Sequence, residues 1–142
     1  MNITLKTEYA LRALQEVIAA GKGKPITRRQ IAKNQGISEH FLEKIFIDLQ
    51  KNRIIKSVRG PGGGFILNRE PHDITLWDVY HAVDDPDYRE DRCYHKTTAG
   101  CEQREQCGVK NIWFKFSRSL KECMVDITLV EITMKRRMMS DE

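Results

Sequence analysis

Residues 27–67 read TRRQIAKNQGISEHFLEKIFIDLQKNRIIKSVRGPGGGFIL, and most of the expected fold follows from this segment. Thr27 followed by Gln30 matches the capping box of a helix start, and that short helix ends near Gly36. Ser38 is expected to cap the next helix. The apolar residues of that helix recur at helical spacing: Phe41, Leu42, Ile45 and Leu49. Two helices joined by a tight turn predict a helix-turn-helix.

A β-hairpin is predicted directly after the helix-turn-helix. Residues 54–58 are β-prone, residues 59–64 form a glycine-rich turn, and residues 65–67 supply the second strand. A hairpin in this position is the wing of a winged helix. The turn lacks the Gly-Lys-Ser/Thr ending of a phosphate-binding loop and leads into a strand, so nucleotide binding is not expected.

Further helices are predicted on both sides of this segment, at residues 4–20, at residues 75–83 and near the C-terminus. The last helix carries an apolar seam at alternating spacings of three and four: Trp113, Phe116, Leu120, Cys123 and Ile127. Cys123 is interpreted as a small buried hydrophobe of this seam. The expected fold class is mainly α, a winged helix-turn-helix with a small β-hairpin wing and a long C-terminal dimerisation helix.

Composition and charge indicate a folded polyanion-binding protein. The 142 residues are 40% hydrophobic and 31% charged, enough apolar material for the core of one ordinary domain. No apolar run could span a membrane and no signal peptide is visible, so we expect a cytoplasmic protein. Residues 22–60 hold ten basic and three acidic side chains, whereas residues 70–91 hold eight acidic and one basic. The basic block predicts binding to nucleic acid.

The expected DNA contacts lie on the two helices of the helix-turn-helix and on the wing. Outward positions expected to face base edges are Ser38, His40 and Glu43, and residues expected to face phosphates or the minor groove are Arg28, Lys44 and Arg59, with Gly62 and Gly63 at the hairpin tip. Glu43 has two open interpretations. It either accepts a hydrogen bond from a cytosine amino group or forms a surface ion pair with Lys44 or Lys51.

Three of the four cysteines fall in one short polar segment, at Cys93, Cys101 and Cys107. In a reducing compartment such cysteines are metal ligands or sensors more often than disulfides. The paired Cys-x-x-Cys knuckles of a zinc ribbon are absent. The spacing is compatible with an iron–sulfur cluster whose fourth ligand comes from elsewhere.

These segments together closely resemble one family of bacterial regulators, the Rrf-type family, which includes IscR, NsrR and CymR. The resemblance extends over nearly the whole chain and is carried by these stretches: residues 9–14, 37–45, 58–65, 78–84, the three-cysteine loop and residues 127–129. It implies a dimeric winged-helix repressor or activator without a catalytic step. Residues 1–84 would form the DNA-binding domain, and residues 85–142 would hold the cluster loop and the dimerisation helix.

The resemblance also implies a ligand set. In cluster-bearing members three cysteines of this loop bind iron, so Cys93, Cys101 and Cys107 inherit that role, although the first gap is longer here than in many relatives. The cluster is of the 2Fe-2S or the 4Fe-4S type, and the resemblance leaves that choice open. The state of the cluster would control the DNA affinity of the dimer or its choice of site, and the site is expected to be a pseudo-palindromic operator.

The fourth ligand differs between branches of the family. IscR-like members use a histidine at the position of Lys110, and a protonated lysine is a poor ligand. NsrR-like members use an acidic residue of the first helix from the other subunit, which corresponds to Glu8. His95, inside the loop, is a local competitor. We rank Glu8 first, His95 second and Lys110 last.

Two alternatives stay open at this point. The first is a cluster-free, CymR-like regulator that acts through thiol chemistry or a protein partner, and the second is a zinc-stabilised DNA-binding scaffold. The resemblance also bears on Glu43, because the matching residue of IscR-like members distinguishes two classes of DNA site.

Overall fold

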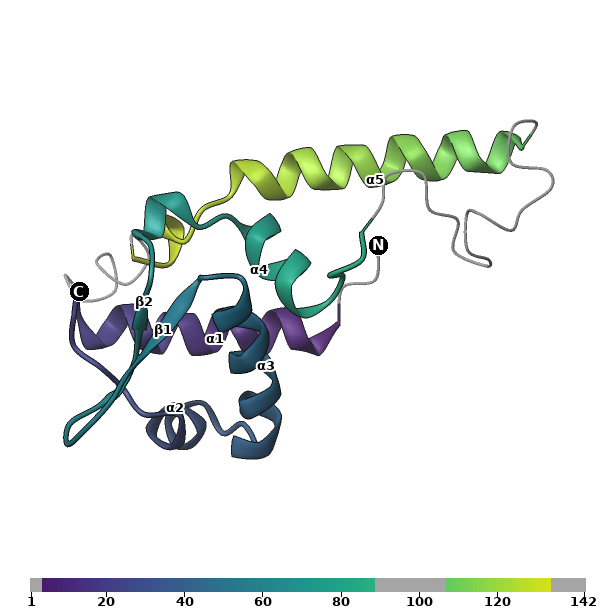
Figure 1. Ribbon diagram of the computed structural model, residues 1–142. Helices are drawn as coiled ribbons and strands as arrows, with labels where there is room; N and C mark the ends of the chain where they lie inside the picture. Colours follow the sequence, from purple (N-terminus) through teal and green to yellow (C-terminus); the bar gives the residue numbers. More distant parts are fainter. Residues whose placement is uncertain (1–3, 89–106, 134–142) are drawn as a thin grey trace.

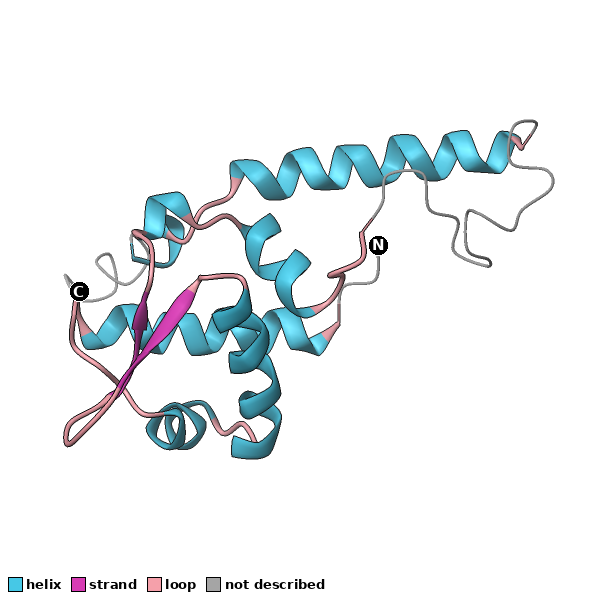
Figure 2. Cartoon of the chain, viewed as in Figure 1, coloured by secondary structure: helices cyan, strands magenta, loops and turns pink. Residues whose placement is uncertain are grey.

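The computed structural model describes residues 4–88 and 107–133 (Figure 1). In chain order they form α1 (Leu5–Ala20), α2 (Arg28–Gln35), α3 (Glu39–Lys51), β1 (Ile55–Val58), β2 (Gly64–Leu67), the short 3-10 helix η1 (Pro71–Asp73), α4 (Leu76–Val83) and α5 (Gly108–Asp126). Figure 2 shows that most of the described chain is helical. The described residues form one sheet, which consists of β1 and β2. The predicted fold class, mainly α with a small hairpin wing, is confirmed.

The core lies where α1, α3 and α4 meet, and the predicted inward residues Leu42, Ile45 and Leu49 are buried in it. Its fully buried side chains include these: Leu14, Leu42, Ile45, Phe46, Leu49 and Val79. Phe41, expected to turn inward, is half-buried and packs edge-on against Tyr9 with ring centroids 5.4 Å apart. Leu5, the first residue of α1, is 59% exposed and lies outside the core.

Asp84, at the end of α4, fixes the start of α1. Its carboxylate accepts hydrogen bonds from the backbone amides of Thr4 and Thr7 at 3.1 and 3.2 Å, and from both threonine hydroxyls. Burial of Asp84 raises its pKa, but these hydrogen bonds outweigh burial and hold the pKa below its ordinary value. One carboxylate therefore satisfies two of the backbone amides at the start of α1, which have no partner within the helix.

The wing is an antiparallel hairpin in which Ile55 pairs with Leu67 and Val58 pairs with Gly64. A Cβ on Gly63 would lie 2.2 Å from the carbonyl oxygen of Val58, so no side chain fits there without reshaping the turn. Gly62 has a φ of +73°, a conformation that glycine adopts at little cost. The glycine-rich turn predicted from the sequence is thus required by the backbone.

α5 runs along the side of the molecule opposite α2, and its amino-terminal half extends beyond α4 (Figure 1). Ser117 and Met124 are its buried residues. The apolar stripe of α5 is exposed, with relative exposures of 57, 67, 37 and 48% for Val109, Ile112, Trp113 and Phe116. Cys123 is also exposed in the single chain, so the prediction that it is buried is wrong for the chain alone.

An aromatic cluster joins α5 to α4. The rings of Trp77 and His81 stack at 5.5 Å, and Tyr88 meets Trp77 edge-on at 4.8 Å. Lys121 Nζ of α5 lies 5.0 Å from the centroid of the Trp77 ring, within the range of a cation–π interaction. Across the described ranges, no helix has the length and apolarity needed to cross a membrane.

Candidate nucleic-acid interface and sensor residues

The helix-turn-helix consists of α2, Gly36 and α3. Thr27 Oγ1 accepts a hydrogen bond from the Gln30 amide at 3.1 Å, which is one half of the predicted capping box. The Gln30 side chain donates instead to Asn34 Oδ1 at 2.7 Å and does not complete the other half. Gly36 adopts a left-handed conformation, with φ +65°, and turns the chain into α3.

The residues expected to read bases lie on the exposed face of α3. Ser38 occupies the predicted N-cap, so its position is confirmed, but its side chain is exposed and makes no capping hydrogen bond. His40 and Glu43 are exposed, and His40 Nδ1 lies 3.9 Å from Glu43 Oε2. Neither Lys44 nor another lysine forms an ion pair with Glu43 in the described residues, which weakens the surface-pair interpretation.

The basic residues divide into two groups. Lys44 on α3 and Arg59 at the base of the wing tip, residues 59–63, are exposed. Arg28 is different, because its Nε lies 4.0 Å from Glu39 Oε1 and its side chain is 31% exposed. Figure 1 shows α2, the start of α3 and the wing tip on one side of the molecule, and we call this the DNA-facing surface. Gly62 and Gly63 lie at its wing end.

The proposed cluster ligands are described only in part. Cys107 is a half-buried free thiol at the N-cap of α5, and Lys110 lies one turn further along. Cys93, His95 and Cys101 fall outside the described residues. In the part of the chain that the structure describes, no group of three potential metal ligands comes together.

Glu8 lies on the exposed side of α1, in an ion pair with Arg12 one turn later. Arg12 Nη2 and Nε lie 2.8 and 3.2 Å from Glu8 Oε1. Beside this pair a hollow of about 610 Å³ opens between α1 and the segment after α5, with Leu11, Ile127 and Ile132 among its lining residues. The carboxylate therefore stands at the rim of an apolar depression.

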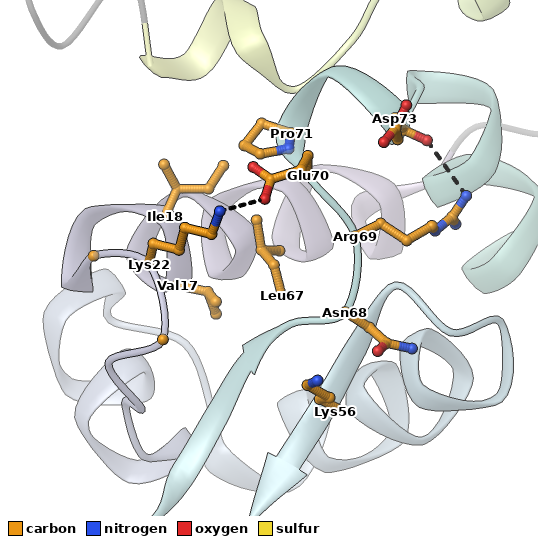
Figure 3. Close-up of a pocket in the computed structure, with 12 residues that line it drawn as sticks. Val17, Ile18, Lys22, Lys56, Leu67, Asn68, Arg69, Glu70, Pro71 and Asp73 are labelled. Carbon is orange, nitrogen blue, oxygen red and sulfur yellow. Dashed lines mark hydrogen bonds and ion pairs between the residues drawn. The ribbon is translucent and has the colours of Figure 1, made fainter.

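A second hollow, of about 590 Å³, lies behind the wing (Figure 3). Lys22 Nζ and Glu70 Oε1 are 2.8 Å apart across it and join the end of α1 to the segment after β2. The hydrogen bond from Lys22 and its charge lower the pKa of Glu70, and the same contact raises the pKa of Lys22. Arg69 Nη1 donates to the carbonyl oxygen of Asp73 at 3.4 Å. Lys22 and Glu70 thus pair across the hollow, whereas Arg69 forms its ion pair with Asp78, 3.5 Å away and not among the lining residues.

Some of these residues were missed by sequence reasoning. The contact of Asp84 with Thr4 and Thr7 joins distant parts of the chain, and no local pattern indicates it. The stack of Trp77 on His81 had a visible signal, since the two residues lie four apart on a predicted helix.

A helix-turn-helix followed by a glycine-tipped wing, with exposed basic residues on both, defines a winged-helix DNA-binding protein. Residues 3–135 match the Rrf2 family, described as an iron-dependent transcriptional regulator. The chain belongs to this family and is a DNA-binding transcriptional regulator.

Individual relatives agree with this assignment. The HTH-type transcriptional regulator IscR of Sodalis glossinidius is 37% identical over 133 residues, which cover 93% of this chain and 78% of that protein. IscR of Escherichia coli O1:K1 / APEC is 35% identical over 132 residues, 93% of this chain and 80% of that protein.

Solved structures of regulators are also similar to this chain. The structure of T. potens IscR superposes with a TM-score of 0.73 at 27% identity, covering 96% of this chain and 88% of that one. CymR, the global cysteine regulator of B. subtilis, superposes with a TM-score of 0.71 at 25% identity, covering 93% and 95%. These relatives are transcriptional regulators and not enzymes.

Proposed function

We propose that this regulator is a homodimer that senses iron–sulfur cluster status, redox state or nitric oxide through a cysteine-ligated cluster. The observation that carries the proposal is the position of Cys107. It ends the three-cysteine segment and is also the N-cap of α5, so the segment continues directly into the helix with the exposed apolar stripe. A change at the ligands is thereby linked to the element expected to hold two copies together.

The donor atoms suit iron. Cysteine thiolates are the usual protein ligands of iron–sulfur clusters, and the Cys107 thiol is half-buried and in no disulfide. Cys93, Cys101 and Cys107 would hold the cluster, with Glu8 of a second copy as the first choice for the fourth ligand, His95 as the second and Lys110 as the last. When bound, the cluster would supply a group that oxidants, nitric oxide or iron shortage can alter or remove.

Glu8 can leave its ion pair and act as a cluster ligand with little loss of stability. Its ion pair with Arg12 is exposed on both sides, with side-chain exposures of 53 and 49%, and exposed pairs contribute little to stability. Arg12 keeps the carboxylate at the rim of the hollow beside α1, on the outer surface where a second copy can approach. A carboxylate binds iron more weakly than a thiolate, so such a site would be sensitive to loss.

On the DNA side, we infer that two copies read a pseudo-palindromic operator with half-sites one helical turn apart or a multiple of it. Ser38, His40 and Glu43 would face base edges, and Lys44 and Arg59 would face phosphates or the minor groove. Arg28 would join them on leaving Glu39. The protein would act in the cytoplasm, where the chromosome lies.

The test is anaerobic purification followed by iron, sulfide and zinc analysis and an absorption spectrum. We expect a brown protein containing iron and sulfide. Cys107→Ala should lose the chromophore, whereas Cys123→Ala, a matched change on α5, should keep it. Full iron content in the combined Cys93, Cys101 and Cys107 to Ala variant would contradict the ligand assignment.

The same preparation, made from three variants, distinguishes the candidates for the fourth ligand. Glu8→Ala should shorten the lifetime of the cluster in air more than His95→Ala or Lys110→Ala. A larger effect of His95→Ala, with Glu8→Ala like wild type, would contradict the contribution from a second copy.

A second candidate is supported by the structural similarity to CymR, namely a cluster-free regulator that acts through thiol chemistry or a protein partner. A colourless protein without metal would favour it. A colourless protein with bound zinc would favour the zinc-stabilised scaffold.

A further inference from the structure

α2 has little apolar anchorage of its own. It is eight residues long, and Ile31 is its one fully buried side chain. A helix of this length is marginal without tertiary contacts. The orientation of α2 on the rest of the domain therefore depends on further contacts.

Besides the packing of Ala32 against the core and the contact of Arg28 with Glu39, α2 is held by polar contacts that converge on Glu16 of α1. Glu16 Oε2 accepts a hydrogen bond from Asn34 Nδ2 at 3.0 Å, and Glu16 Oε1 accepts one from Gln35 Nε2 at 2.6 Å. Asn34 Oδ1 in turn accepts from Gln30 Nε2 at 2.7 Å. One carboxylate thus holds both residues at the end of α2, and the chain of hydrogen bonds continues back to its first turn.

Hydrogen bonds to an ionised carboxylate are stronger than those between neutral groups, because the acceptor carries a full charge. Within the described residues, Glu16 forms no ion pair with a basic side chain, and both of its oxygens are used by neutral amides. The carboxylate belongs to this network and not to a salt bridge of the α1 surface.

We propose that Glu16 is a positioning residue for DNA binding, which fixes the orientation of α2 through Asn34 and Gln35. The first helix of a helix-turn-helix crosses the DNA backbone, so its orientation sets where its basic residues meet phosphates. The first turn of α2 carries Arg28 and Arg29, and its other end leads through Gly36 into the start of α3. Glu16 itself does not contact DNA in this account.

The proposal predicts an effect opposite in sign to simple electrostatics. A carboxylate near DNA is repelled by phosphates, so loss of its charge alone should strengthen binding to any duplex. Loss of a positioning contact should instead weaken binding, and should weaken it most for the sequence that the protein prefers.

The experiment measures affinity for two duplexes. The probe is a duplex selected from a random library by the wild-type protein, with a scrambled duplex of the same composition as the second substrate. Glu16→Gln keeps the size of the side chain and removes its charge, and Glu16→Ala removes the acceptors altogether. Glu122→Gln is the matched control, because Glu122 pairs with Arg118 at 3.4 Å on α5, away from the DNA-facing surface.

We expect Glu16→Ala to weaken binding to the selected duplex by about 10-fold, the size expected for loss of charge-assisted hydrogen bonds. Glu16→Gln should weaken it by a smaller factor, and Glu122→Gln should leave it unchanged. The preference for the selected over the scrambled duplex should fall in both Glu16 variants. Circular dichroism at the binding temperature should be that of the folded wild type, which separates positioning from unfolding.

A combined variant tests whether Glu16 acts through its hydrogen bonds with Asn34 and Gln35. Asn34→Ala with Gln35→Ala should weaken binding as Glu16→Ala does, and the triple variant should be no weaker. Tighter binding of Glu16→Gln to both duplexes, or losses that add fully in the triple variant, would overturn the proposal. The proposal rests on DNA binding but not on the cluster. A wild-type protein that selects no duplex would contradict the DNA-binding function and the proposal with it, whereas Glu16 variants that bind like wild type would contradict the proposal alone.

Discussion

Two regions of the molecule differ in how they cover their phenylalanine side chains. We call the winged helix, residues 5–83, the finished region and α5 the unfinished region. Phe46 of α3 is 1% exposed, and it packs edge-on against Phe65 of the wing at 4.7 Å. Phe116 of α5 is 48% exposed, and its ring meets Trp113 on the same exposed stripe at 6.0 Å. The winged helix buries most of its apolar residues within one chain, with Leu5, Ile47 and Val58 as exposed exceptions, whereas α5 presents most of its large apolar residues to the outside. Large contiguous apolar surfaces of this kind mark interaction sites.

The largest expected effect is in the finished region. Phe46→Ala removes a fully buried ring from between α3 and the wing and should reduce the free energy of unfolding by about 3–5 kcal/mol. Phe116→Ala, measured by urea denaturation at a protein concentration low enough to keep single chains apart, should change it by less than about 1 kcal/mol. Equal losses in the two variants would mean that the stripe of α5 is packed within its own chain.

The wing gives the next largest effect. Gly63→Ala forces a Cβ against the Val58 carbonyl oxygen and should cost about 1–3 kcal/mol of local stability, with weaker DNA binding as the turn reshapes. Gly62→Ala is the control, because its Cβ meets open space and the change costs only the left-handed conformation. In gel-shift titrations the DNA affinity of Gly63→Ala should be lower than that of Gly62→Ala, and both should be lower than that of the wild type. The reverse order would show that sterics at Gly63 do not shape the wing.

Asp84 should give a smaller effect that depends on pH. Because its pKa is lower in the folded protein than in the unfolded chain, its contribution to stability is present above the unfolded value and disappears as the pH falls through the folded value. Asp84→Ala should therefore lower the free energy of unfolding by about 1–2 kcal/mol at pH 7, with a gap to wild type that closes in acid. Asp87→Ala, at an exposed neighbouring position, should show no such gap. A gap that persists unchanged at pH 2 would contradict the role of the charged carboxylate.

The smallest effect is expected at Lys22 and Glu70. Both side chains are exposed, so water and salt screen their attraction. Glu70→Ala should leave the thermal unfolding midpoint unchanged within error at moderate salt. A clear fall in that midpoint would mean that the hollow behind the wing depends on this pair.

The sequence predicted the finished region well, because local rules govern it. Helical spacing located the buried residues Leu42, Ile45 and Leu49 of α3, and the glycines located the wing. Prediction failed where a side chain had a choice of partners. Ser38 occupies the expected N-cap without a capping bond, and Gln30 donates to Asn34 and not back toward Thr27. The two partners of Glu16, Asn34 and Gln35, lie on another helix, so no pattern within either helix indicates these contacts.

The unfinished region was predicted less well, for a physical reason. Spacings of three and four on α5 identify an apolar seam but not what covers it, and Cys123 was expected to be buried for that reason. Of the candidate cluster ligands, Cys107, Lys110 and Glu8 are described in place, whereas Cys93, His95 and Cys101 lie outside the described residues. The ligand set is therefore a proposal that the chemical analysis of iron and sulfide tests.

The central claim, that a second copy of the chain covers the stripe of α5, is tested most directly by sedimentation equilibrium. The comparison is between wild type and a variant with Ile112→Glu and Phe116→Glu, which places two charges on the stripe at positions 67 and 48% exposed in the single chain. The account predicts a wild-type mass of twice one chain and a variant mass of one chain, with the circular dichroism of a folded winged helix in both. A monomeric wild type, or a variant that still sediments as a dimer, would contradict it.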